Sequence, residues 1–188
     1  MTADDRILVR RAQNGDTDAF ESLVRSHERR VYNLCLRMMG SPEDAADAAQ
    51  EALLKAWRSI DSFRGMSAFS TWLHRIAVNV CNDMLRRRRP ALVSVEVMQE
   101  SGWEITDPKA DDFTERSVNS QIVLDGLTRV SPDHRTVLVL RDIQGFSYEE
   151  IGQMLECPTG TVRSRLSRAR KSLADVVRAM EQNRKLTV

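Results

Sequence analysis

Apolar side chains recur at intervals of three and four residues along two long stretches of the sequence, residues 5–90 and residues 115–182. This spacing places them on one face of an α-helix, so both stretches predict amphipathic helices that pack into a core. The chain has 5 proline and 8 glycine residues and 5% aromatic residues, too few for a β-sandwich or β-barrel. We therefore predict an all-α protein with two small helical domains, residues 1–90 and 116–188. A flexible acidic linker, residues 91–115, joins them.

Helix boundaries are marked most clearly in the first domain. The apolar stripe predicts one helix over residues 19–39. Ser41 can cap the next helix, and Pro42 suits its first turn because proline has no amide hydrogen to leave unpaired there. Residues 62–67 break the pattern and predict a loop, and a third helix follows over residues 68–88.

The net charge of +1 conceals a segregation of charge along the chain. Residues 62–90 contain six basic residues and one acidic residue, and residues 159–188 contain eight and two. Residues 41–61 contain five acidic and two basic residues, and residues 91–116 contain seven and two. Basic segments favour polyanion partners, because lysine and arginine displace the counterions condensed on phosphates. An ordinary solvated face has the same composition, so charge alone does not decide the function.

The clearest local motif is a predicted helix-turn-helix in the second domain. Ser147 and Glu150 have the spacing of a capping box, which starts a short helix. Residues 156–158 leave room only for a sharp corner, and Gly152 is small enough to let a second helix cross closely. The second helix begins near Thr159 and turns four apolar residues inward: Val162, Leu166, Ala169 and Leu173.

The outward positions of this second helix carry hydroxyl or cationic groups, namely Arg163, Ser164, Arg165, Ser167, Arg168, Arg170 and Lys171. Such a face can reach base edges and phosphates in the major groove of DNA. A basic amphipathic helix at a domain surface is the alternative. The short corner, the small residue and the Arg/Ser/Thr face occur together, which favours DNA reading.

A second candidate nucleic-acid surface lies at the end of the first domain. The run Arg86–Arg89 suits a phosphate backbone. The preceding loop offers Arg64, Ser67 and Ser70 as exposed polar groups, and a small polar loop beside a basic helix can hold a base that has left the stack. Spacing alone does not establish such a pocket, and Trp72 is predicted to belong to the core.

The sequence disfavours membrane and secreted proteins. No apolar run approaches the roughly 18 residues that a membrane span needs. The charged first eleven residues lack the apolar core of a signal peptide. We therefore expect no membrane insertion and a cytoplasmic location. The three cysteines, Cys35, Cys81 and Cys157, form neither a disulfide framework nor a metal pair, and the first two lie on apolar stripes that predict buried thiols.

Enzymatic and metal-binding functions are also disfavoured. The three histidines, His27, His74 and His134, show no metal-ligand spacing. The acidic residues Asp44, Asp47 and Glu51 could mimic a metal site on one helix face together with His74. No second carboxylate–histidine helix completes that site. We expect no enzyme, no metal and no cofactor.

Four ordered motifs extend over nearly the whole chain. The first two are Asp44-Ala45-x-Asp47-x-x-Gln50-Glu51 with Trp57, and Phe69-x-x-Trp72-Leu73-x-x-Ile76-Ala77-x-Asn79. The third is Asp83-x-x-Arg86. The fourth runs from Ser147-Tyr148-Glu149-Glu150-Ile151-Gly152 to Gly160-Thr161-Val162-Arg163-Ser164-Arg165-Leu166-x-Arg168-Ala169-Arg170. In this order they resemble bacterial RNA polymerase sigma factors of the extracytoplasmic-function (ECF) group of the sigma-70 family. Such proteins have two helical domains, region 2 and region 4, joined by a linker.

The resemblance implies a function and three sets of site residues. Sigma factors bind core RNA polymerase and direct it to promoters for stress or envelope-response genes, and an anti-sigma factor holds them inactive. The residues that correspond to the surface for the polymerase β′ clamp helices are Asp47, Gln50, Glu51, Lys55 and Trp57. Those for the minus-ten element and the non-template single strand are Arg64, Ser67, Ser70, Asn79, Asp83, Arg86 and Arg87. Those for the duplex minus-thirty-five element are Thr159, Thr161, Arg163, Ser164, Arg165, Ser167, Arg168 and Lys171.

The resemblance also implies that region 4 meets the polymerase β flap. Two positions depart from the family pattern. Glu156 stands at the corner where a small residue is common, and it is strained if the corner needs a positive φ. Thr159 stands where an apolar residue is common. The alternatives are a stand-alone helix-turn-helix regulator, which leaves the Asp/Gln/Glu/Trp helix unexplained, and a structural adaptor, which leaves the Arg/Ser/Thr face unexplained.

Overall fold

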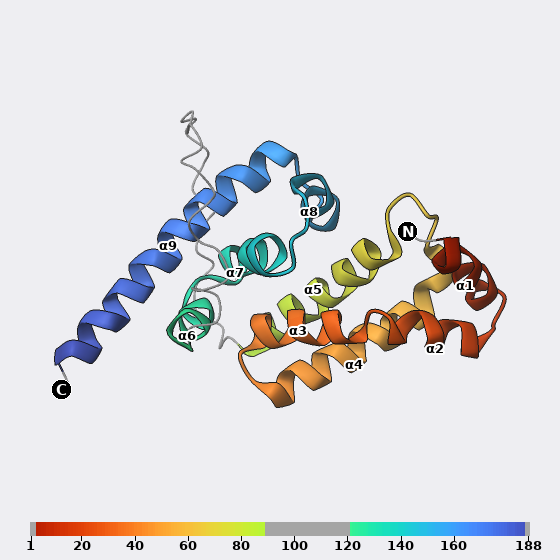
Figure 1. The fold of residues 1–188 in the computed structure, drawn as a ribbon, viewed down its shortest axis with the longest axis horizontal. Coiled ribbons are helices and arrows are strands. Elements are labelled where there is room, and N and C mark those ends of the chain that lie inside the picture. The colour runs from red at the N-terminus through yellow and green to blue at the C-terminus, as the bar shows by residue number, and fades with distance from the viewer. Residues whose placement is uncertain (1–2, 89–120, 187–188) are drawn as a thin grey trace.

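The computed structural model describes residues 3–88 and 121–186, and all regular elements within these ranges are helical (Figure 1). This confirms the predicted all-α class. The predicted linker lies outside the described residues. The first part of the chain forms α1 (Ala3–Gln13), α2 (Thr17–Arg25), α3 (Glu28–Met39), α4 (Pro42–Ser59), the short 3₁₀ turn η1 (Ile60–Ser62) and α5 (Phe69–Arg88). The second part forms α6 (Gln121–Arg129), α7 (Pro132–Leu138), the π-helical turn η2 (Val139–Ile143), α8 (Tyr148–Leu155) and α9 (Thr159–Leu186).

The predicted single helix over residues 19–39 is wrong, because the chain turns at Ser26 and His27 and so divides it into α2 and α3. The Ser26 hydroxyl donates to the Leu23 carbonyl at 2.8 Å, which satisfies one of the carbonyls that a helix end leaves unpaired. The His27 ring packs against Phe69 with the ring centroids 5.5 Å apart. Both helices bury residues of the same stripe, so apolar spacing does not reveal the corner.

The other predicted boundaries in the first domain are confirmed. Ser41 is the N-cap of α4, its hydroxyl oxygen accepts from the Asp44 amide at 3.4 Å, and Pro42 lies in the first turn. The predicted third helix coincides with α5. Five buried alanines let α4 approach its neighbours closely: Ala45, Ala48, Ala49, Ala52 and Ala56. Cys35 and Cys81 are fully buried in this core, as predicted.

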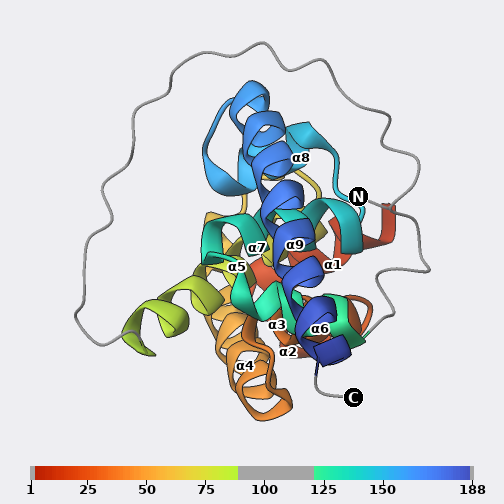
Figure 2. The same cartoon turned by 90° about the vertical axis from the view of Figure 1, so that its left-hand side faces the viewer.

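The two halves of the chain pack against each other and share one apolar core. Six buried residues of the second half join the core of α1–α5: Val139, Leu140, Phe146, Ile151, Met154 and Val162. Figure 2 shows α7 and α8 against the first domain, where α7 contacts α3 and α5, and α8 contacts α5. A smaller apolar cluster lies between α6, α7 and α9. The sequence predicts two domains but not this closed packing, because neither apolar stripe specifies which partner covers it.

Two buried polar side chains, Arg135 and His74, contact the opposite half of the chain. The buried Arg135 of α7 donates to the Met38 carbonyl at the end of α3. The same guanidinium donates to the Thr128 carbonyl at 2.6 Å. The fully buried His74 of α5 packs edge-on against Phe146, with ring centroids 4.9 Å apart. The closed arrangement therefore rests on buried groups as well as on surface contacts.

Gly40 is expected to be one of the most sensitive positions of this interface. Its φ is +77°, and a Cβ at this position lies 2.6 Å from Cγ2 of Thr128 in the other half. Alanine at Gly40 combines backbone strain with a steric clash, and we expect it to lower the free energy of unfolding by about 2 kcal/mol. Denaturant unfolding of the full chain measures this loss.

Gly15 supplies a matched control for that substitution. Its φ is +87°, and a Cβ there meets no atom within 4 Å. Alanine at Gly15 therefore carries the backbone strain without the clash, and we expect roughly half of the loss seen at Gly40. Equal losses at the two positions contradict a contribution from the contact with Thr128.

Candidate nucleic-acid interface

The predicted helix-turn-helix is present as α8, a short corner and α9. The capping box is confirmed: the Ser147 hydroxyl oxygen accepts from the Glu150 amide at 3.2 Å, and the Glu150 carboxylate accepts from the Ser147 amide at 2.8 Å. Gly152 lies against the corner, since a Cβ there lies 2.8 Å from the Cys157 carbonyl oxygen. Its small size therefore serves the turn and the start of α9.

The corner adopts the conformation that makes Glu156 an unusual choice. Glu156 has a φ of +53°, and it is the sole non-glycine residue with positive φ among the described residues. The predicted strain at this position is confirmed, because a side chain in the left-handed region costs energy that glycine avoids. The Glu156 carboxylate forms an exposed ion pair with Arg75 of α5. An exposed pair contributes little free energy, so it does not offset the strain in full.

The first turns of α9 present the predicted cationic face. Val162, Leu166, Ala169 and Leu173 are buried, as predicted. Thr159, Arg163, Arg165, Arg168 and Lys171 are exposed, and Thr161, Ser164 and Ser167 are half-buried between them. The expectation that Arg170 also faces outward is wrong. Arg170 is half-buried and donates to Asp142 of η2 at 2.7 Å, because its place on the helix turns it toward α7 and η2.

Two arginines of this face have side-chain contacts that hold them. The Arg168 Nε donates to the Ser164 carbonyl at 3.3 Å, one turn earlier on the same helix. The Arg163 guanidinium lies over the ring of Tyr148, with its central carbon 5.4 Å from the ring centroid. The Arg141 guanidinium lies over the same ring at 4.9 Å. The start of α9 is therefore a positively charged face on which some side chains are already ordered. Such a face suits binding to the phosphates and base edges of a duplex.

The predicted minus-ten residues divide into two groups on and before α5. Arg64, Ser67 and Ser70 lie in the loop before α5 and in its first turn. The second group, Asn79, Asp83, Arg86 and Arg87, lies along the second half of the helix. Asn79 and Arg87 are exposed, whereas Asp83 and Arg86 pair with each other. At 1.5 Å per residue, the two groups are separated by roughly 15–25 Å along the helix.

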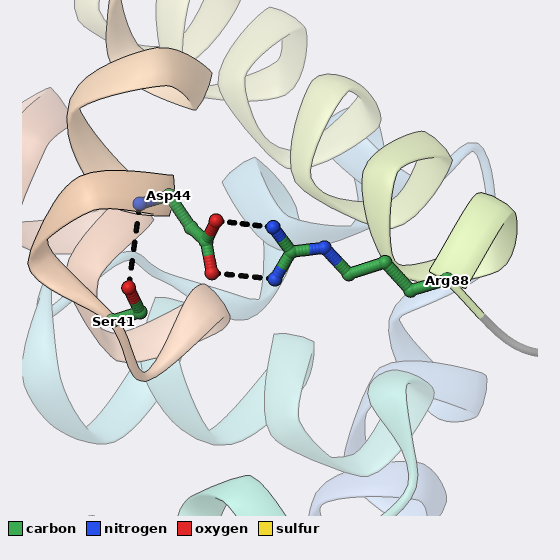
Figure 3. A network of polar contacts seen from close by, with 3 residues as sticks. All are labelled: Ser41, Asp44 and Arg88. Carbon is green, nitrogen blue, oxygen red and sulfur yellow. Dashed lines mark hydrogen bonds and ion pairs between the residues drawn. The ribbon is translucent and has the colours of Figure 1, made fainter.

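Arg88 of the basic run is held by an acidic partner from another helix. Figure 3 shows its guanidinium forming two bonds with the Asp44 carboxylate, while the Asp44 amide binds the Ser41 hydroxyl at the start of α4. The guanidinium lowers the pKa of Asp44 and the carboxylate raises the pKa of Arg88. This pair ties the end of α5 to the start of α4. Arg88 is therefore less available for phosphates than the exposed Arg87.

A cavity of about 310 Å³ lies between the loop before α5 and helix α8. The loop contributes Met66 and Ser67, α5 contributes Trp72, and α8 contributes Gln153 and Met154. Trp72 is half-buried and packs on Phe63 and Phe69, so the prediction that it belongs to the core is confirmed for part of its ring. The cavity has both polar and apolar walls.

The predicted polymerase-binding residues all lie on α4. Asp47 and Gln50 are exposed, and Glu51 and Lys55 form an ion pair at 3.6 Å. Trp57 lies to one side of them and packs on Phe20 of α2, with ring centroids 4.9 Å apart. Leu54 lies between the polar residues and is 42% exposed. Leu54 thus adds an exposed apolar group to this otherwise polar face of α4.

Sequence reasoning missed three residues that the structure places at these surfaces. Leu54 lies outside the predicted buried stripe and Met66 lies in the predicted loop, so neither was given a role, and the structure leaves them 42% and 91% exposed. Tyr148 occurs within the capping box, and its contact with Arg163 of the next helix depends on the tertiary arrangement. An apolar residue out of phase with the buried stripe is the signal that could have identified Leu54.

Within the described residues, no cluster of three or more histidine, cysteine, aspartate or glutamate side chains has the geometry of a metal site. No helix there is long and apolar enough to cross a membrane.

The fold and the cationic helix-turn-helix define a two-domain helical protein of the DNA-binding class. Residues 23–91 match the family model for sigma-70 region 2, and residues 114–173 match the model for sigma-70, region 4. The chain is 41% identical over 185 residues to the ECF RNA polymerase sigma-E factor of Escherichia coli strain K12, covering 94% of this chain and 95% of that protein. The sigma-E factor of Haemophilus influenzae is 38% identical over 183 residues, covering 94% and 96%. This chain therefore belongs to the ECF sigma factors of RNA polymerase.

Solved structures show the same fold. CnrH in complex with the cytosolic domain of CnrY superimposes with a TM-score of 0.68 at 28% identity, covering 94% of this chain and 98% of CnrH. The sigma factor RpoE of Bartonella quintana, solved with the anti-sigma factor NepR, gives a TM-score of 0.63 at 24% identity, covering 85% and 96%. Sigma factors give RNA polymerase its promoter specificity and are not enzymes, so membership excludes the enzyme, regulator and adaptor alternatives.

Proposed function

We propose that this chain binds core RNA polymerase through α4, reads the minus-ten element with α5 and its preceding loop, and reads the minus-thirty-five element with α9. The observation that carries the proposal is the exposed cationic face at the start of α9, placed by a capped α8 and a sharp corner. That geometry presents arginine, threonine and serine side chains to a major groove. In this proposal the chain acts on DNA in the cytoplasm and uses neither a metal nor a cofactor.

For the polymerase, the proposed surface is the exposed side of α4. Asp47, Gln50, Glu51 and Lys55 supply polar groups that suit the β′ clamp helices, and Leu54 supplies an apolar centre. Trp57 supports this surface by packing α4 on α2. Region 4 is proposed to contact the β flap. An acidic and polar rim around an apolar residue is a common composition for a transient interface.

For promoter opening, the proposed base-capturing surface is the loop before α5 together with the start of α5, which α8 covers in the closed arrangement. Arg64, Ser67 and Ser70 are placed around an unstacked base of the non-template strand, and Asn79 and Arg87 follow the strand along α5. Capture of an extruded base offsets a few kcal/mol of unstacking. In the closed arrangement, Gln153 and Met154 of α8 form one wall of the cavity beside this loop, so α8 competes with an incoming base.

The closed arrangement cannot read both promoter elements at once. The two elements are about 25 base pairs apart, or roughly 85 Å along B-DNA. The ion pair between Arg75 and Glu156 instead joins α5 directly to the corner before α9. The two regions must therefore separate on the promoter. The chain between residues 88 and 121, fully extended, reaches roughly 110 Å, which is long enough for that separation.

An anti-sigma factor is the third proposed partner. CnrH, whose structure is similar to 94% of this chain, was solved in complex with the cytosolic domain of CnrY. A protein that covers the closed form of this chain blocks both the polymerase surface and the promoter surfaces. Such a partner keeps the chain inactive until it is removed.

Reconstituted transcription tests the proposal. The purified chain and core RNA polymerase are incubated with a randomised promoter library, and transcript starts are sequenced. We expect transcripts only when both components are present, with two separated sequence motifs upstream of the starts. Selection of duplex DNA by the chain alone, without polymerase-dependent transcripts, contradicts the proposal. A known sigma factor serves as the positive control.

Replacing Arg168 with alanine is expected to reduce transcription from the selected promoters about tenfold, because one arginine contact to a base or phosphate contributes roughly 1–3 kcal/mol. Core polymerase binding, measured by fluorescence anisotropy, is expected to stay unchanged. Arg178→Ala is the matched control, since Arg178 is exposed on the same helix, about two turns before its end, and pairs with Asp175. Equal losses of core binding and promoter use rule out the role of Arg168.

A further inference from the structure

The three exposed arginines at the start of α9, Arg163, Arg165 and Arg168, differ in their side-chain contacts. Arg163 lies over an aromatic ring from α8, and Arg168 is bonded to its own helix at Ser164. Arg165 has neither type of contact among the described residues. An arginine that must read a base edge needs a fixed plane, whereas one that binds a phosphate tolerates several orientations. The different contacts of the three arginines therefore indicate a division of roles.

We propose that Tyr148 is a positioning residue for promoter recognition, which orients the Arg163 guanidinium for reading a base of the upstream element. This inference rests on the proposed function of α9. Tyr148 is the first residue of α8, directly after the N-cap Ser147, so the capping box fixes its backbone. Its half-buried ring packs against both apolar clusters, which restrains the ring itself.

The ring and the guanidinium have complementary charge. The Arg163 central carbon lies 5.4 Å from the ring centroid, within the distance at which a cation is attracted to the face of an aromatic ring. Arg163 itself is exposed, so without this contact its long side chain samples many rotamers. Stacking on the ring removes part of that freedom before DNA arrives. Preorganisation of this kind improves binding by lowering the ordering cost.

Arg141, the second arginine at this ring, has a structural role. Arg141 lies 4.9 Å from the same centroid and donates to the Phe146 carbonyl at 2.9 Å. That bond holds the segment between η2 and α8, which carries Ser147 and hence the capping box. Arg141 thereby supports the position of the ring, and Arg163 is the group that the ring presents to solvent.

Substitutions at Tyr148 separate positioning from packing. Tyr148→Phe keeps the ring, and we expect unchanged transcription by the holoenzyme. Tyr148→Leu keeps an apolar side chain but removes the ring. We expect it to lower transcription about fivefold, in line with loss of a cation–π contact, and to flatten the base preference only at the upstream position that Arg163→Ala also flattens. The promoter library with core polymerase and the full chain measures both effects.

Double variants provide the matched comparison. Tyr148→Leu is expected to cause no further loss in a chain that already carries Arg163→Ala, because the two act through one contact. In a chain that carries Arg165→Ala its effect is expected to be undiminished. A uniform loss at all upstream positions, or an equal loss in both backgrounds, overturns the positioning role and indicates a general weakening of α8.

A direct measurement on the free chain covers the case in which Tyr148→Leu loosens α8. The order parameter of the Arg163 Nε–H bond, from ¹⁵N relaxation, is expected to fall in Tyr148→Leu and to be retained in Tyr148→Phe. An equally mobile Arg163 in all three proteins overturns the inference. If Arg163→Ala changes no base preference, the assignment of Arg163 as a reader fails. If it does and Tyr148→Leu changes none, only the role of Tyr148 fails.

Discussion

Replacing Arg135 with alanine is expected to lower the free energy of unfolding by at least about 3 kcal/mol, the largest loss that we expect from any single substitution. Arg135 is 5% exposed, and its guanidinium donates to the carbonyls of Met38, Thr128 and Val130. These carbonyls belong to the ends of α3 and α6, where helices leave carbonyl groups unpaired and negatively polarised. Alanine leaves them buried without the charged donor.

Thermal unfolding of the full chain measures this loss as a fall in midpoint of roughly 6–12 °C. Arg129→Ala is the matched control, because Arg129 is an exposed arginine on α6 and its loss is expected to change the midpoint by less than 2 °C. Arg135→Lys retains a positive charge with fewer donors, and we expect its unfolding midpoint to lie between those of Arg135→Ala and Arg129→Ala. A midpoint within 2 °C of the unsubstituted chain for Arg135→Ala shows that these carbonyls do not depend on Arg135.

Acid is expected to destabilise the closed protein through His74. Burial lowers the pKa of His74 from 6.5 to about 4, and the nearby positive charge of Arg30 and the neighbouring His27 act in the same direction. The ring is fully buried, with Nδ1 2.7 Å from the Ser70 carbonyl, which makes Nδ1 the protonated nitrogen of the neutral ring. Nε2 has no hydrogen-bond partner among the described residues, so a proton added there is buried unpaired.

The direction follows from proton linkage. Between pH 6.5 and pH 4 the unfolded chain binds a proton at His74 that the folded chain excludes, so stability is complete above pH 6.5 and falls as the pH is lowered. By pH 4 the loss from this one group is about 3 kcal/mol. Opening of the two regions, which exposes His74 to water, follows the same dependence. His27, whose pKa burial also lowers, adds a loss of the same sign.

The measurement compares denaturant unfolding of the full chain at pH 7 and pH 4.5. His74→Gln is expected to be less stable at pH 7 but to lose less stability on acidification. His134→Gln is the control, since His134 is less buried than His74 and its charged neighbours are Arg168 and Asp133. An acid dependence in His74→Gln equal to that of the unsubstituted chain assigns the effect to other groups, namely His27 or carboxylates.

Local signals predicted much of the fold because each acts within a few residues. The Ser147–Glu150 capping box, the Ser41 cap and the inward residues of α9 all depend on helical spacing and hydrogen bonds within one turn. The corner at Ser26 and His27 escaped detection because α2 and α3 continue one apolar stripe. The strain at Glu156 was predictable because short corners between crossing helices often need a positive φ.

The candidate sites likewise combine features that the sequence predicted with features that it did not. The sequence placed the cationic residues of α9 and the acidic face of α4, because periodicity and charge identify a solvent-facing side of a helix. It did not reveal that Asp83 pairs with Arg86, that Arg88 pairs with Asp44, or that Arg170 pairs with Asp142. Two of these three pairs join residues from different helices, and such contacts exist only after the helices have packed.

The sequence by itself determined the helical class, the division into two regions, the family and most of the polar residues that face solvent on α4 and α9, because these depend on local spacing and on ordered motifs. The tertiary structure decided that region 4 closes on region 2, with Arg135 at the end of α3 and His74 against Phe146. It also decided that Tyr148 meets Arg163 and that Leu54 and Met66 stay exposed. The physical reason is that an apolar stripe requires some apolar surface, and a charged side chain requires some group of opposite charge or water. Which particular residue meets that requirement is decided only when the whole chain packs.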